Sequence, residues 1–138
     1  MCALALAACL TPEARLDQAT QLLVDGHVAE ARKRYEALGE SPDVRVRIRA
    51  SLGAAKAAAA AKDAKAQRFW IEQAKTLPET PGLSEEAYYQ WAEILRSDGD
   101  RPGALRWYYR SAALAERAGH SDLYQRASNA CAAMSMTP

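Results

Sequence analysis

Apolar residues recur at steps of three and four along most of the chain, which is the spacing of one face of an α-helix. From Thr11 onward, seven such segments are separated by short turns rich in glycine, proline, serine and aspartate. The helices are expected to begin near Pro12, Val28, Val44 and Asp63, after a cap at Ser84, near Pro102 and at Ser121. They are expected to end at Asp25-Gly26, Gly39, before Asp63, at Pro78, Asp98-Gly99, Gly119 and about Met134. Short turns between helices of this length predict an all-α fold of antiparallel helical hairpins.

Two of the predicted helices begin with the same signal. Thr11-Pro12-Glu13 and Ser41-Pro42-Asp43 each place a capping residue before a proline and an acid. Residues 44–49 alternate between apolar residues and arginine, which locally resembles a strand. A helix is nevertheless expected there, because Val44, Ile48 and Leu52 also form one stripe at steps of four.

The N-terminal segment is apolar and ends in small residues before a cysteine. Leu6-Ala7-Ala8-Cys9 resembles the lipobox of bacterial lipoproteins, in which the cysteine is lipidated and becomes the first mature residue. We therefore interpret residues 1–9 as a partial lipoprotein signal segment and Cys9 as the lipidation site. No basic residue precedes the apolar run, so we expect the precursor to begin upstream of Met1. The alternative is an ordinary apolar N-terminus on a cytosolic protein.

Composition narrows the class of protein. The chain has 138 residues, 31 of them alanine, and its 18 basic and 17 acidic residues leave a formal net charge of +1. Abundant alanine favours helices in close contact, and the balanced charge argues against a nucleic-acid binder. Of the three cysteines, Cys131 would stay unpaired after cleavage before Cys9, so no disulfide framework is expected.

The hairpins are similar to one another. A small residue is followed four positions later by an aromatic in Ala31…Tyr35, Ala66…Trp70 and Ala104…Tyr108, with the alanines 35 and 38 residues apart. Over about residues 12–134 the chain resembles the tetratricopeptide-repeat family. The matching positions also include Gly26, Gly99, Leu52-Gly53, Pro78 and Tyr88, whereas Arg15 and Ala50 stand where the family prefers tryptophan. The resemblance implies about three repeats and a C-terminal capping helix in a single domain over residues 10–138.

The resemblance also implies a function. In this family the inner helices line a concave groove that binds a peptide or helix of a partner protein. Carried onto this sequence, the partner-binding positions are Tyr89, Glu93, Arg96, Arg47, Ala50, Ala54 and Leu16. Core packing alone would also explain Tyr89, and a solvated helix start would explain the arginines at 45, 47 and 49.

The sequence offers no catalytic constellation. His27 and His120 each lie beside a glycine in a turn, and Glu85-Glu86 lies at a helix start, where the helix dipole accounts for it. No cysteine–histidine spacing fits zinc, so we expect no enzyme, cofactor or metal site. The combined expectation is a lipid-anchored, periplasm-facing adaptor at the bacterial outer membrane, serving secretion, pilus or envelope assembly. The alternative is a cytoplasmic tetratricopeptide-like regulatory domain.

Overall fold

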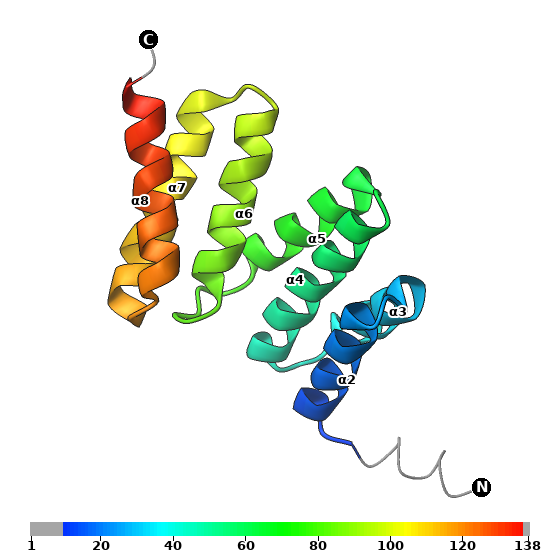
Figure 1. The fold of residues 1–138 in the computed structure, drawn as a ribbon. Helices are drawn as coiled ribbons and strands as arrows, with labels where there is room; N and C mark the ends of the chain where they lie inside the picture. The colour runs from blue at the N-terminus through cyan, green and yellow to red at the C-terminus, as the bar shows by residue number, and fades with distance from the viewer. Residues whose placement is uncertain (1–9, 137–138) are drawn as a thin grey trace, which may run out of the picture. The chain divides into compact units, whose positions relative to one another are not determined.

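A computed structural model describes residues 10–136, and over this range the chain is helical, with no strand (Figure 1). Seven α-helices follow one another along the described chain. They are α2 (Pro12–Val24), α3 (Val28–Leu38), α4 (Val44–Ala60), α5 (Ala64–Thr76), α6 (Ser84–Ser97), α7 (Arg101–Ala118) and α8 (Ser121–Met136). The all-α prediction is confirmed. The lipobox and Cys9 lie outside the described residues.

The helix starts follow the capping signals. The Thr11 side chain accepts a hydrogen bond from the Ala14 backbone N–H at 3.2 Å, and Pro12 takes the first helical position. The Asp43 carboxylate caps α4 by accepting the Arg45 N–H at 2.9 Å. The alternating segment 44–49 is helical because the cap and the long alanine run behind it favour propagation of one helix.

The helices pack in two compact units. The sequence predicts one domain over residues 10–138. The first unit ends at Gln67 and the second begins at Arg68. Helices α2, α3 and α4 pack together in the first unit, and α6, α7 and α8 pack together in the second. The division falls inside α5, whose only buried side chains are Ile71 and Ala74.

The core of the first unit depends on close contact between α3 and α4. Ala31 and Tyr35 of α3 are buried, as the repeat pattern predicts. The Tyr35 ring lies against Gly53 of α4, where a Cβ atom would overlap it. The Thr20 hydroxyl donates to the Leu16 carbonyl at 3.0 Å, so the 2.7 Å bond between the Tyr35 and Thr20 hydroxyls has tyrosine as its donor. The absence of a side chain at Gly53 thus leaves room for the Tyr35 ring.

The core of the second unit is built on α7. Ala104 and Tyr108 are fully buried, and Ala92 of α6 and Met134 of α8 belong to the same apolar cluster. The Arg101 guanidinium also donates to the Met134 carbonyl. Figure 1 shows α6, α7 and α8 side by side in this unit. The alanine–aromatic pattern therefore marks the packing of α7 as it does that of α3.

The middle pair of the alanine–aromatic pattern is less buried than the other two pairs. Ala66 and Trp70 of α5 are only half-buried, whereas Ile71 and Ala74 are 2% and 1% exposed. The buried stripe of α5 is therefore offset from the one that the repeat pattern predicts.

Candidate functional site

Three of the predicted partner-binding residues lie together on α6. Tyr89, Glu93 and Arg96 are spaced by four and three residues, which places them on one face of the helix. The hydroxyl of Tyr108, on α7, donates to Glu93 Oε1. The Arg96 guanidinium also interacts with the same hydroxyl. We call Tyr89, Glu93, Arg96, Tyr108 and Arg126 the tyrosine cluster.

The Tyr108 hydroxyl is the centre of this cluster because it is both donor and acceptor. Burial and the hydrogen bond to Glu93 raise the pKa of Tyr108 well above its ordinary value. The interaction of the Arg96 guanidinium, as donor, with the Tyr108 oxygen raises the pKa of Arg96 as well. The phenol therefore stays protonated and holds one carboxylate and one guanidinium in fixed positions.

Tyr89 is held from both sides. Its ring meets the Tyr108 ring edge-on with centroids 5.6 Å apart, and the Arg126 guanidinium of α8 lies 5.0 Å from the Tyr89 centroid. Burial, followed by the negative charge of Glu93, raises the pKa of Tyr89. Tyr89 is half-buried, whereas Glu93 and Arg96 are exposed. The cluster consequently presents an acceptor and a cation on a rigid aromatic base.

The predicted partner-binding residues of the first unit are buried or half-buried. Leu16, Ala50 and Ala54 are 2%, 0% and 0% exposed. They pack inside the unit, and the expectation that they face a partner is corrected. Arg47 is half-buried and its Nε donates to the Gly39 carbonyl at 3.3 Å. Helix α2 packs on both α3 and α4 within the first unit.

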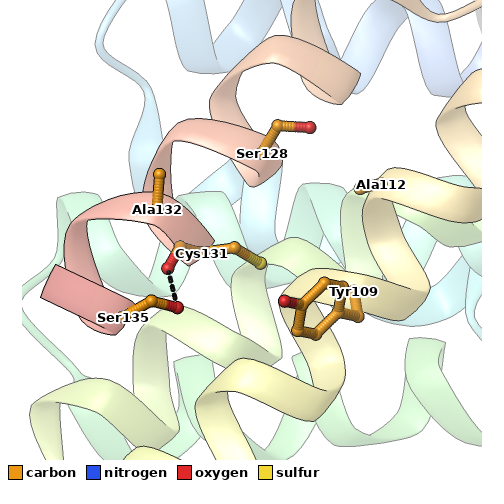
Figure 2. Close-up of a pocket in the computed structure, with 6 residues that line it drawn as sticks. All are labelled: Tyr109, Ala112, Ser128, Cys131, Ala132 and Ser135. Carbon is orange, nitrogen blue, oxygen red and sulfur yellow. Dashed lines mark hydrogen bonds between the residues drawn. The ribbon is translucent and has the colours of Figure 1, made fainter.

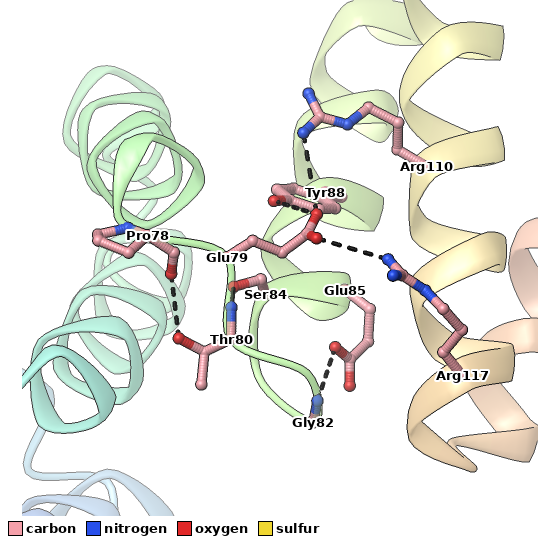
Figure 3. Close-up of polar contacts among 9 residues, drawn as sticks. All are labelled: Pro78, Glu79, Thr80, Gly82, Ser84, Glu85, Tyr88, Arg110 and Arg117. Atoms are coloured by element: carbon pink, nitrogen blue, oxygen red, sulfur yellow. Dashed lines mark hydrogen bonds and ion pairs between the residues drawn. The ribbon is translucent and has the colours of Figure 1, made fainter.

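The loop before α6 carries a polar cluster that the sequence analysis missed. Figure 3 shows Glu79 between one tyrosine and two arginines. The Tyr88 hydroxyl donates to Glu79 Oε1 at 2.9 Å, and the guanidinium groups of Arg110 and Arg117 lie 3.9 and 3.5 Å from its carboxylate oxygens. Burial, together with the Glu79 bond, raises the pKa of Tyr88 to about 12. These contacts tie the loop to α7.

Glu85, in the first turn of α6, is a fully buried carboxylate. It accepts the Gly82 backbone N–H at 3.0 Å, and its other oxygen lies 3.4 Å from His120 Nδ1. The Ser111 hydroxyl donates to the Glu85 carbonyl at 2.8 Å. Glu85 thus lies at the helix start that the sequence predicts, and its burial and its pairing with the half-exposed His120 are additional features of the structure. No sequence signal marks this pairing, because the two residues are 35 positions apart.

A shallow groove of about 280 Å³ lies between α7 and α8 (Figure 2). Its lining is mostly small or apolar: Tyr109, Ala112, Ser128, Cys131, Ala132 and Ser135. Tyr109 is 61% exposed, and Figure 2 shows its ring facing the Cys131 side of the groove. Burial raises the pKa of the Cys131 thiol, which favours the unreactive thiol form.

Within residues 10–136, no three side chains of the metal-ligating types come close enough to hold an ion. In the same range, no helix combines the length and the apolar character that crossing a membrane requires. Comparison of the chain with protein-family models, with curated proteins and with solved structures gives no match.

Proposed function

We propose that this chain is an adaptor that binds a protein partner through the tyrosine cluster and is anchored to the bacterial outer membrane by lipid on Cys9. The fold of helical hairpins supports the binding role, since stacked hairpins expose helix faces suited to peptides and helices. The resemblance to the tetratricopeptide family and to a lipobox supports the partner class and the anchor. Secretion, pilus and envelope assembly are the processes that such adaptors serve.

The observation that carries the binding role is the fixing of two exposed opposite charges by one buried hydroxyl. Glu93 and Arg96 are both held by Tyr108. Because neither side chain needs to be ordered when a partner arrives, less conformational entropy is lost on binding. A partner segment would place a donor against the carboxylate and an acceptor against the guanidinium. Tyr89, packed below them, supplies apolar contact area.

The binding test uses isosteric changes that keep the core filled. Glu93→Gln combined with Arg96→Gln removes both charges while leaving groups that can still hydrogen-bond the Tyr108 hydroxyl. Arg45→Gln is the matched control, because Arg45 is an exposed arginine of α4 in the first unit. Bait proteins are compared for the envelope proteins that they capture, after circular dichroism has verified equal helicity. Loss of a captured protein with the double variant and its retention with the control supports the proposal.

Equal capture by wild type, control and double variant would refute the tyrosine cluster as the binding face. Tyr89→Ala is not suitable for this test, because the ring packs on Tyr108 and its removal opens a cavity.

The anchor is tested separately. Metabolic labelling with a fatty-acid analogue is expected to mark the wild type and Cys2→Ser, and to leave Cys9→Ser unlabelled. Cys2 is the matched control because it precedes the expected cleavage site. Several acyl chains on one cysteine give stable membrane attachment, whereas one chain gives only marginal attachment. Equal labelling of Cys9→Ser and wild type, or no labelling of either, would favour the cytoplasmic alternative.

A further inference from the structure

A second surface of the second unit carries cations stacked on aromatic rings. Lys75 Nζ lies 4.2 Å from the Trp91 centroid and 5.1 Å from that of Trp107. The Arg110 guanidinium carbon lies 4.5 Å from the Trp107 centroid and 4.8 Å from that of Tyr88. Such contacts attract the cation to the ring face and fix its position. In the stacked arginine the edge of the guanidinium, which carries its N–H donors, stays free to meet an acceptor.

Along α7, next to these stacks, the arginines form one exposed stripe. Arg106, Arg110 and Arg117 are exposed and lie at steps of four and seven residues, which is one face of a helix. The side chains of Arg110 and Arg117 are 50% and 66% exposed. The stripe from Arg106 to Arg117 is about 16 Å long at 1.5 Å per residue.

This stripe has more positive charge than its neighbours neutralise. Arg110 and Arg117 share the single carboxylate of Glu79, at the long distances of 3.9 and 3.5 Å. Among the described residues, no acidic side chain forms an ion pair with Arg106, and Lys75 has only its aromatic contacts. One carboxylate therefore serves four cations on this surface.

We propose that Lys75, Arg106, Trp107, Arg110 and Arg117 form a basic face that binds an acidic helix of a partner protein. Carboxylates at steps of three or four residues along such a helix would match the arginine stripe. The half-buried Trp107 indole would lie beneath the contact and reduce its hydration. The basic face is separate from the tyrosine cluster, so this proposal does not rest on the proposed function.

Charge favours a short acidic protein segment over a nucleic acid. The second unit contains eight basic and nine acidic side chains, and four of the eight basic ones belong to the basic face. A long phosphate backbone would extend beyond a stripe of about 16 Å onto a unit that is negative overall. A segment of about three helical turns fits within the stripe.

The test uses a designed helical peptide whose glutamates are spaced by four, three and four residues, and its glutamine counterpart. Binding to the full chain is followed by tryptophan fluorescence, since Trp91 and Trp107 lie beneath the cations. At low ionic strength the glutamate peptide is expected to bind and the glutamine peptide is not, and added salt is expected to weaken binding. Arg110→Gln with Arg117→Gln is expected to weaken binding by about tenfold or more.

The matched control is Arg45→Gln, which changes an exposed arginine of α4 that belongs neither to the basic face nor to the tyrosine cluster. Its effect is expected to be less than about twofold, because an exposed charge outside the stripe is screened. Three results would overturn the proposal: no binding of the glutamate peptide, equal binding of both peptides, or equal weakening by the control. Tighter binding of a single-stranded oligonucleotide than of the glutamate peptide would also overturn it. Circular dichroism of each variant verifies that the helices remain.

Discussion

Replacement of Gly53 by alanine tests whether α3 and α4 need the close contact that glycine permits. In an exposed helix, alanine in place of glycine stabilises by about 1 kcal/mol. At this position the new Cβ atom would lie 2.6 Å from Tyr35 Cζ and closer still to Cε1. Tyr35 is 4% exposed and its hydroxyl is bonded to Thr20, so the ring cannot move aside freely.

The magnitude follows from two opposing contributions. Overpacking of a filled core costs about 1–3 kcal/mol, and the gain in helix propensity offsets about 1 kcal/mol of it. Gly53→Ala is therefore expected to destabilise the chain by up to about 2 kcal/mol. In a Tyr35→Val background the effect of Gly53→Ala on stability should have the opposite sign. Valine lacks the ring atoms that the new Cβ atom would meet. There, Gly53→Ala should stabilise by about 1 kcal/mol.

The assay is urea unfolding followed by circular dichroism. It compares the wild type, Gly53→Ala, Tyr35→Val and the double variant. Ala59→Gly is the control for helix propensity, since Ala59 is exposed on the same helix, and it should cost about 1 kcal/mol. A Gly53→Ala variant that is about 1 kcal/mol more stable than the wild type would refute the reasoning. So would the same change in stability in both backgrounds, since the two residues would then be uncoupled.

Ala104→Leu should destabilise by about 1–3 kcal/mol, because Ala104 is fully buried, whereas Ala113→Leu on the exposed side of α7 should change the melting temperature little. Tyr88 has a pKa raised from 10.0 to about 12, so the stability that it contributes is complete below pH 10 and is lost as the pH rises through 12. Between pH 10 and pH 12 the wild type should lose about 2–3 kcal/mol of unfolding free energy through Tyr88. In Tyr88→Phe this contribution should be absent from the alkaline unfolding curve. Ser111→Ala should cost about 1 kcal/mol in urea unfolding, because it removes the buried bond to the Glu85 carbonyl.

Local patterns were the part of the fold that the sequence could predict. The caps at Thr11 and Asp43 depend only on neighbouring residues, and both helix starts agree with the structure. The alanine–aromatic spacing found the buried pairs of α3 and α7, because each pair lies on one helix face. It did not find the buried residues of α5, where Ile71 and Ala74 are buried and Ala66 and Trp70 are only half-buried.

The candidate site was predictable only in part. The face shared by Tyr89, Glu93 and Arg96 follows from their spacing on one helix. That Tyr108 binds two of them could not be predicted, because it is 15 residues from Glu93 and its own pattern marked it only as a core aromatic. The burial of Ala50 and Ala54 depends on α2 packing across α4, which is a tertiary contact that no local pattern specifies.

Alkylation of the Cys131 thiol can be used to follow the detachment of α8 from α7. Cys131 is the free thiol of the described chain and is 7% exposed, and burial raises its pKa. Cys131 also lines the groove between α7 and α8, so a small alkylating reagent has some access to its sulfur while α8 is docked. Detachment of α8 from α7 adds to this labelling, so the labelling rate sets an upper limit on the opening equilibrium. The Arg101 guanidinium, bound to the Met134 carbonyl one helical turn away, opposes this detachment. The labelling rate of Cys131 thus gives a lower limit for the free energy of opening of the last helix.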